Sequence, residues 1–106
     1  MLDKIKEALL NRNSEWGSVS PGALFRAVEL GGEAGEALNE VKKLERTKLG
    51  MVGGKTDIQP LADELGDVII SAILLAIEYD LDLEKCAIDK FNKTSQKHGF
   101  KTRIEV

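Results

Sequence analysis

Apolar residues recur along most of this chain at the three- and four-residue steps of an α-helix. The longest such series predicts a helix over residues 21–49, and its apolar positions are Ala23, Ala27, Leu30, Ala34, Leu38 and Val41. Further helices are predicted over about 58–79 and 82–97, the latter with Asp82 as its N-cap. A short amphipathic helix precedes them all, with Ile5, Ala8 and Leu9 on one side. Because the chain shows neither β-type alternation nor an internal repeat, the pattern predicts an all-α fold of four to five helices.

Proline and glycine residues indicate where the helix predicted over 21–49 begins and where it is interrupted. Ser20 and Pro21 predict its start, as the N-cap and the first helical residue. Glycines at 31, 32 and 35 interrupt it, and each costs about 1 kcal/mol relative to alanine. They indicate a close approach of another helix, room for a ligand, or a locally strained helix.

Two segments lie outside the predicted helices. Residues 50–56 form a loop, whose Gly53-Gly-Lys-Thr56 sequence does not fit a phosphate-binding P-loop, because residue 49 is Leu and no strand precedes it. Residues 101–106 form either a short extended segment or a frayed end.

Two features predict self-association. A helix over 21–49 would be about 40 Å long, more than a compact domain of this size needs. The third predicted helix is apolar nearly all round after Val68, which implies burial on every side. One four-helix chain rarely achieves this, so we expect a bundle assembled as a homo-oligomer, at least a dimer.

Composition bounds the class of protein. The 106 residues predict a single domain over 1–106, and the net charge of −3 provides no basic patch for duplex nucleic acid. The longest apolar run, 68–77, has ten residues, whereas a membrane span needs roughly 20, and the N-terminus has no secretory apolar region. Cys86 is the single cysteine, which excludes an internal disulfide. We therefore expect a cytoplasmic protein with no membrane partner.

Two acidic pairs carry the candidate chemistry. Glu33 and Glu36, and then Glu64 and Asp67, are each spaced i, i+3, so both members of a pair project from one helix face. The second pair opens the apolar run 68–77, where no Lys or Arg lies close by in sequence. Buried carboxylates need a compensating charge, and oxygen ligands suit Mg²⁺, with Mn²⁺ as a substitute. The two pairs therefore predict one metal site assembled from two helices.

Each pair also has a plainer interpretation. Glu33 and Glu36 belong to a stripe with Glu29 and Glu40, which could be a solvated acidic face. The second pair could complement the dipole at the start of its helix. The glycines and alanines around the first pair, which leave room for a ligand, favour the metal site.

Positive charge and one aromatic residue complete the candidate set. Lys90, Thr94 and Lys97 share a helix face with the apolar Leu83 and Cys86, so we expect them to point partly inward, where the lysines would suit a polyphosphate. The alternative is that these lysines snorkel at the edge of the bundle. Trp16, just before the second helix, is either a lid on the core or a platform on which a base stacks.

The acidic pairs, separated by a spacer of 27 residues, resemble the signature of the MazG-type all-α nucleoside triphosphate pyrophosphohydrolases. The blocks 29–36, 61–68 and 90–100 each resemble a block of that family, in the same order. The resemblance implies a helical homodimer or homotetramer that depends on Mg²⁺ and hydrolyses nucleoside triphosphates to the monophosphate and pyrophosphate. It also implies roles for individual residues: metal ligands at Glu33, Glu36, Glu64 and Asp67, and substrate contacts at Lys90, Thr94 and Lys97. Thr94 stands where some members have Asn, and Trp16 is the one candidate match to their N-terminal aromatic residues.

Metal-assisted hydrolysis of a nucleoside triphosphate is therefore the function that the sequence predicts. A non-catalytic helical module that binds nucleotides, or that only self-associates, is the alternative from another class. A related helical enzyme acting on another pyrophosphate-containing nucleotide also stays open, because base selectivity depends on the shape of the pocket.

Overall fold

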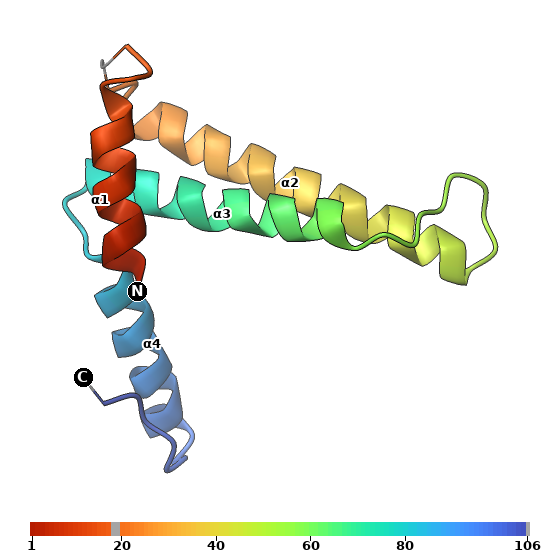
Figure 1. The fold of residues 1–106 in the computed structure, drawn as a ribbon. Coiled ribbons are helices and arrows are strands. Elements are labelled where there is room, and N and C mark those ends of the chain that lie inside the picture. Colours follow the sequence, from red (N-terminus) through yellow and green to blue (C-terminus); the bar gives the residue numbers. More distant parts are fainter. Residues whose placement is uncertain (18–19, 106) are drawn as a thin grey trace.

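The fold was analysed in a computed structural model that describes residues 1–17 and 20–105. This part of the chain contains four helices and no strand, which confirms the all-α prediction (Figure 1). The helices are α1 (Leu2–Asn13), α2 (Ala23–Lys48), α3 (Gln59–Glu78) and α4 (Leu83–Lys97). Among these residues, no helix combines the length and apolar content that a bilayer span requires.

The long helices α2 and α3 form an antiparallel hairpin, and α1 and α4 lie at the end of it opposite the connecting loop (Figure 1). The buried apolar residues mark where the elements meet, and they are Leu9, Ala37, Ile73 and Ala76. Two of the four are alanines, whose small side chains allow close packing of helices. The hairpin therefore holds the middle of α2 against α3, and it is the scaffold on which both acidic pairs lie.

The loop between α2 and α3 folds back onto the last turn of α2. The Thr47 hydroxyl donates to the Lys55 carbonyl at 2.7 Å, and the Lys55 amide donates to the Lys43 carbonyl at 3.1 Å. A Cβ atom on Gly54 would lie 2.3 Å from the Thr47 hydroxyl oxygen, so this close approach requires glycine. The predicted loop is confirmed, and its hydrogen bonds hold it against the end of α2.

The start of α2 differs from the prediction. Ser20 and Pro21 do not cap and open the helix; Gly22 is the N-cap, and its φ of 90° is a conformation that breaks the helix at this point. The Ser20 hydroxyl instead contacts the carboxylate of Glu78 at the end of α3. Asp82 does cap α4 as predicted, because its carboxylate accepts from the Lys85 amide at 3.2 Å.

A single chain leaves much of its surface open. The radius of gyration is 17.3 Å, whereas a compact domain of this length has about 13 Å. The accessible surface is 7994 Å², against about 5,800 Å² for a compact monomer of this mass. Ile69 on α3 is 48% exposed, so the predicted burial of α3 on every side is not achieved within one chain. Leu38 on the neighbouring α2 is 69% exposed.

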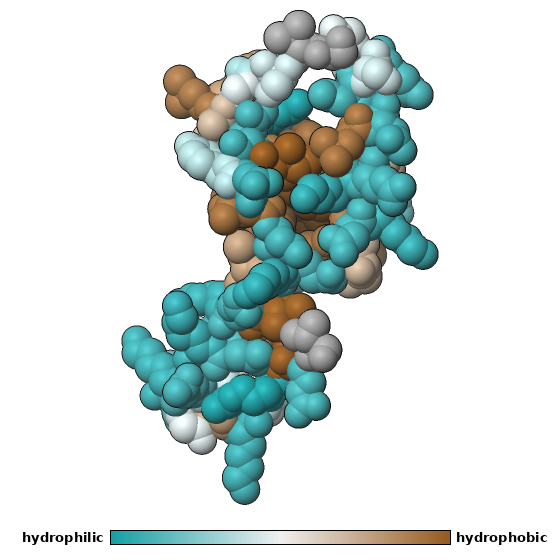
Figure 2. All heavy atoms as spheres, turned by 90° about the vertical axis from the view of Figure 1, so that its left-hand side faces the viewer, coloured by the Kyte–Doolittle hydropathy of each residue, from teal (hydrophilic) through white to brown (hydrophobic). Residues whose placement is uncertain are grey.

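Figure 2 shows one face of this open surface. Apolar side chains gather in a hollow in the upper part of the molecule, framed by hydrophilic residues, whereas the lower part, which contains α4, is mostly hydrophilic.

The three glycines in the middle of α2 also face open space. A Cβ atom on Gly31, Gly32 or Gly35 would meet nothing within 4 Å. No other part of the described chain therefore makes the close helix approach that these glycines would permit.

Candidate metal centre and adjoining cavity

The hairpin brings the two acidic pairs together. Glu33 projects from the middle of α2, and Glu64 and Asp67 project from the first half of α3. One carboxylate oxygen from each of these three residues lies within 4.8 Å of the other two. Glu36, one turn further along α2, lies close enough to Glu33 and Glu64 to shift the pKa of both carboxyl groups. Three of the four acids that the sequence singled out therefore converge in one chain, and Glu36 lies beside them.

The acidic stripe of α2 divides into paired and unpaired members. Glu29 accepts from Arg26 at 3.1 Å, and Glu40 accepts from Lys43 at 3.0 Å. Glu33 lies between them and has no cationic side chain within 4.0 Å in residues 1–17 and 20–105. The same holds for Glu36 in the described chain. A uniformly solvated acidic face does not account for this division, because the outer glutamates have cations and the inner ones face other carboxylates.

The dipole of α3 does not account for the second pair. The first turn of α3, which begins at Gln59, contains no acidic residue. Glu64 and Asp67 follow five and eight positions after Gln59, and the influence of a helix terminus fades within one turn. Their carboxylates therefore face the Glu33 and Glu36 side of α2 without compensation from the helix terminus.

Mutual repulsion and burial raise the pKa of two of these groups. A hydrogen bond with the Glu36 carboxyl, which requires a shared proton, is the largest cause that raises the pKa of Glu64 to about 7. Desolvation and the charges of Glu36 and Glu33 act in the same direction. Desolvation, followed by the charges of Glu36 and Asp67, raises the pKa of Glu33. Without a cation, the cluster therefore holds protons that ordinary carboxyl groups would release.

The cluster fits a hard divalent cation. The Oε2 atoms of Glu33 and Glu64 are buried and have no hydrogen-bond partner among residues 1–17 and 20–105. A buried acceptor without a partner is costly, and a cation placed between the carboxylates would satisfy both atoms. The donor set consists of carboxylate oxygens, which Mg²⁺ and Mn²⁺ prefer over nitrogen or sulfur ligands. Glu33, Glu64 and Asp67, with Glu36 beside them, are the residues that would hold it.

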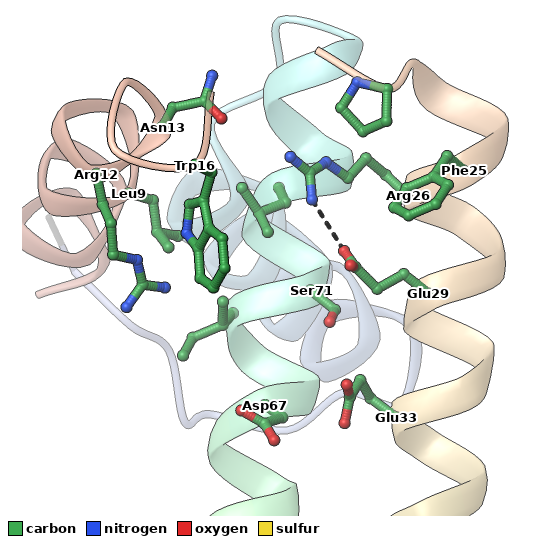
Figure 3. A pocket seen from close by; sticks show the side chains of 13 residues that line it. Leu9, Arg12, Asn13, Trp16, Phe25, Arg26, Glu29, Glu33, Asp67 and Ser71 are labelled. Atoms are coloured by element: carbon green, nitrogen blue, oxygen red, sulfur yellow. Dashed lines mark hydrogen bonds and ion pairs between the residues drawn. The ribbon is translucent and has the colours of Figure 1, made fainter. Parts of the chain in front are cut away.

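A cavity of about 430 Å³ adjoins the acidic cluster. Its volume lies within the range of small-molecule sites. Glu33 and Asp67 lie at one end, and side chains from α1, the start of α2 and α3 form its walls (Figure 3). The polar wall residues are Arg12, Asn13, Arg26, Glu29 and Ser71, and the apolar ones include Leu9, Phe25, Ile70 and Leu74. The arrangement provides an anionic end joined to a largely apolar chamber that contains two arginines.

Trp16 lines this cavity from the segment that follows α1 (Figure 3). Its side chain is not a lid sealed over the core, because the residue is 78% exposed. An indole that is exposed at the mouth of a cavity can stack against a planar ligand. The exposure argues against the lid on the core, and base stacking by Trp16 stays a prediction.

Lys90, Thr94 and Lys97 are not brought to the cluster within one chain. All three are exposed on α4 and do not line the cavity, so the expectation that they point inward is wrong for a single chain. Another face of α4, on which Ser95 is buried, is the one that the segment after the helix contacts, because the Phe100 amide donates to the Ser95 carbonyl at 2.8 Å. On the same side, the Asn92 side chain donates to and accepts from the Ile104 backbone at 2.8 and 2.7 Å.

The same two hydrogen bonds determine where the tail, residues 101–105, lies. Asn92 holds Ile104 beside α4, so the tail is tethered at this point and is not a frayed end, although residues 101–105 belong to no helix or strand. Residue 106 lies outside the described residues.

Sequence reasoning missed two arginines of the cavity. The Arg26–Glu29 pair has the i, i+3 spacing of a helical ion pair, and this signal could have identified it. Arg12 has no such signal, because only the packing of α1 against α3 brings it to the cavity.

The raised pKa of Glu64 predicts how the metal-free protein responds to pH. The folded value of about 7 lies above the ordinary 4.5, so the folded state binds more protons between these values and the free energy of unfolding falls as the pH rises through them. We expect Glu64→Gln, which mimics the protonated group, to remove part of this loss. Urea unfolding in a chelator at about pH 5 and about pH 7.5 measures it. Equal pH dependence in the wild type and the variant would contradict the assigned environment.

The comparison with protein families agrees with this geometry. The model of the MazG nucleotide pyrophosphohydrolase domain matches residues 26–100. The match includes all four carboxylates and excludes α1 and Trp16. Searches of curated proteins and of solved structures found no match. Because the family model covers well over half of the chain, the resemblance of the acidic pairs is confirmed, and the chain belongs to the MazG nucleotide pyrophosphohydrolase family.

Proposed function

We propose that this chain is a divalent-metal-dependent hydrolase that converts a nucleoside triphosphate to the monophosphate and pyrophosphate. The observation that carries the proposal is the convergence of Glu33, Glu64 and Asp67 within 4.8 Å, with Glu36 beside them, at one end of a ligand-sized cavity. Family membership supports the reaction class. The single Cys86 and the nucleotide substrate favour the cytoplasm as its compartment.

The four carboxylates would hold Mg²⁺, or Mn²⁺ in its place. Such an ion supplies charge neutralisation of the triphosphate and of the departing pyrophosphate, and it lowers the pKa of water. By holding that ion, the carboxylates would place the triphosphate end of the substrate at the α2–α3 seam. One of them, Glu33 or Glu36, orients the attacking water and accepts its proton while the bond between the α- and β-phosphates breaks.

The rest of the substrate would extend into the cavity. With the phosphates at the Glu33 and Asp67 end, the nucleoside lies toward Trp16, whose exposed indole can stack on the base. Arg12 lines the same chamber from α1 and supplies a positive charge there. Lys90, Thr94 and Lys97 would contribute to a site only across a subunit contact, because α4 lies away from the cavity of its own chain.

We propose further that the active form is a homo-oligomer, a dimer or a tetramer. The accessible surface of 7994 Å² exceeds the value for a compact monomer by about 2,000 Å². This excess exceeds what each subunit contributes to a standard interface, about 800 Å². Leu38 and Ile69, on neighbouring helices of the hairpin, are exposed apolar residues that a second subunit would cover.

Removing a carboxylate of the cluster tests the enzymatic proposal. We expect Glu36→Ala and Asp67→Ala to lower pyrophosphate release by about a hundredfold or more, because each removes oxygen that neutralises transition-state charge through the ion. Glu45→Ala is the matched control, since Glu45 lies on the exposed side of α2 in an ion pair with Lys48. Release is measured with ribo- and deoxyribonucleoside triphosphates, with and without Mg²⁺.

Two results would contradict the enzymatic proposal. One is wild-type pyrophosphate release by either cluster variant. The other is no release by the wild-type protein with any nucleotide at saturating Mg²⁺, which is what the non-catalytic alternative predicts. Thermal melting separates the alternatives independently, because an ion that binds only the folded cluster raises the melting temperature of the wild type and not that of Asp67→Ala.

A charge on the open apolar surface tests the oligomer. Leu38 is 69% exposed in one chain, so Leu38→Glu should cost a monomer little, whereas a charge buried in an interface would dissociate it. We expect the mass from light scattering to fall to that of a smaller species. Val52→Glu, at a loop position that is 97% exposed, is the control. A wild-type protein that is monomeric at every concentration tested would contradict this proposal.

A further inference from the structure

The Arg26–Glu29 ion pair is an unusual element of the cavity wall. The Arg26 guanidinium donates to Glu29 at 3.1 Å, and their side chains are only 14% and 31% exposed. Arg26 Nε is buried and has no hydrogen-bond partner in the described chain. An exposed i, i+3 pair contributes only a few tenths of a kcal/mol, and a buried unsatisfied donor costs more than that. Helix stability therefore does not account for the pair.

The Arg26–Glu29 pair lies where the nucleoside of the proposed substrate would bind, and not at the acidic cluster, where its phosphates would bind. Both side chains project from α2 into the space that Trp16 enters from the other side (Figure 3). Glu29 and Arg26 precede Glu33 by four and seven residues, which places them about 6 and 10 Å along the helix from the acidic cluster. Because Arg26 neutralises Glu29, this carboxylate is not a fifth member of the metal centre, and the proposed hydrolysis does not use it.

The Glu29 carboxylate and the Arg26 guanidinium, which lie next to each other, can each form further hydrogen bonds with a ligand. A carboxylate has about four lone-pair positions, of which the Arg26 contact uses one, so Glu29 can accept two further hydrogen bonds. A guanidinium has five N–H donors, of which the Glu29 contact uses one, so Arg26 retains terminal N–H donors besides its buried Nε–H. A planar ligand that stacks on Trp16 would therefore meet two acceptors beside a donor.

Guanine is the nucleobase whose edge matches this pattern. It presents N1–H and the 2-amino group side by side as donors to a carboxylate, with O6 next to them as an acceptor for the guanidinium. Adenine presents the N1 acceptor where guanine has a donor, and uracil flanks its one N–H with carbonyl oxygens. Cytosine presents one donor beside two acceptors. A carboxylate that faces any of these three edges meets at least one acceptor, which weakens binding.

We propose that the Arg26–Glu29 pair selects guanine, so that the preferred substrates are guanine nucleoside triphosphates. This inference rests on the proposed function, of which it names the substrate class. Glu29 accepts from N1–H and the 2-amino group, Arg26 donates to O6, and Trp16 covers the face of the base. The pair positions the nucleoside and takes no part in bond cleavage.

The first test uses the wild-type protein and needs no variant. We compare kcat/KM for GTP, dGTP, ITP, ATP, CTP and UTP, because ITP differs from GTP only in lacking the 2-amino group. A bidentate carboxylate contact predicts GTP and dGTP over ITP and ATP by about tenfold or more. Pyrophosphate release from all six at similar efficiency would overturn the guanine assignment and leave the proposed hydrolase intact.

The second test assigns the selectivity to the pair. Glu29→Gln replaces one acceptor by a donor, so we expect kcat/KM for GTP to fall about tenfold, toward that for ITP, with the ATP value changed much less. Glu45→Gln is the matched control on the exposed side of α2. A uniform fall for all nucleotides would show that Glu29 only supports the fold, and would overturn the assignment.

Binding of the product monophosphates separates this inference from the proposed hydrolysis. We expect calorimetry with the wild-type protein to give a lower Kd for GMP than for IMP or AMP, and Glu29→Gln to remove the difference. If no triphosphate were hydrolysed, the proposed function would fail while the GMP preference still decided whether the pair selects guanine. Equal affinity for the three monophosphates would overturn the inference whatever the activity.

Discussion

Repulsion between carboxylates that no protein cation offsets is the constraint on which this structure depends. The hairpin holds one carboxylate oxygen each of Glu33, Glu64 and Asp67 within 4.8 Å, and a buried oxygen of Glu33 and one of Glu64 have no hydrogen-bond partner in the described chain. A chain selected only for stability would replace or pair such groups, as it does with Glu29 and Glu40 on the same helix. Protons partly relieve the repulsion near neutral pH, and a divalent cation would relieve it fully.

The hairpin can hold these carboxylates close together because it consists of two long helices that lie side by side. The two helices, joined by the folded-back loop and packed through small residues such as Ala37, place acids from distant parts of the sequence next to one another. This scaffold is open, with apolar side chains on α2 and α3 exposed and α4 directed away from the hairpin. The same arrangement that builds the acidic cluster therefore leaves a single chain with more exposed surface than a compact domain of its size.

Sequence reasoning predicted what depends on local periodicity. The helices, the loop, the Asp82 cap and the facing of the two acidic pairs all follow from spacing within a helix and from the pairing of two long helices. The start of α2 was missed because the positive φ of Gly22 outweighed the Ser-Pro signal. The placement of Lys90, Thr94 and Lys97 was missed because α4 is directed away from the hairpin, so its apolar spacing does not bring this face to the acidic cluster. The cavity required α1 to be placed against α3, which no sequence pattern indicated.

The most direct test of the central claim is the binding of Mn²⁺ followed by electron paramagnetic resonance, since bound and free Mn²⁺ give different signals. The account predicts saturable binding by the wild-type protein at neutral pH, competition by Mg²⁺, and loss of binding when Glu64 and Asp67 are replaced together by Gln and Asn. These replacements keep the side-chain shape and remove the charge. Saturable Mn²⁺ binding that persists in the double variant, or none in the wild type, would contradict the claim that these carboxylates converge to hold a cation.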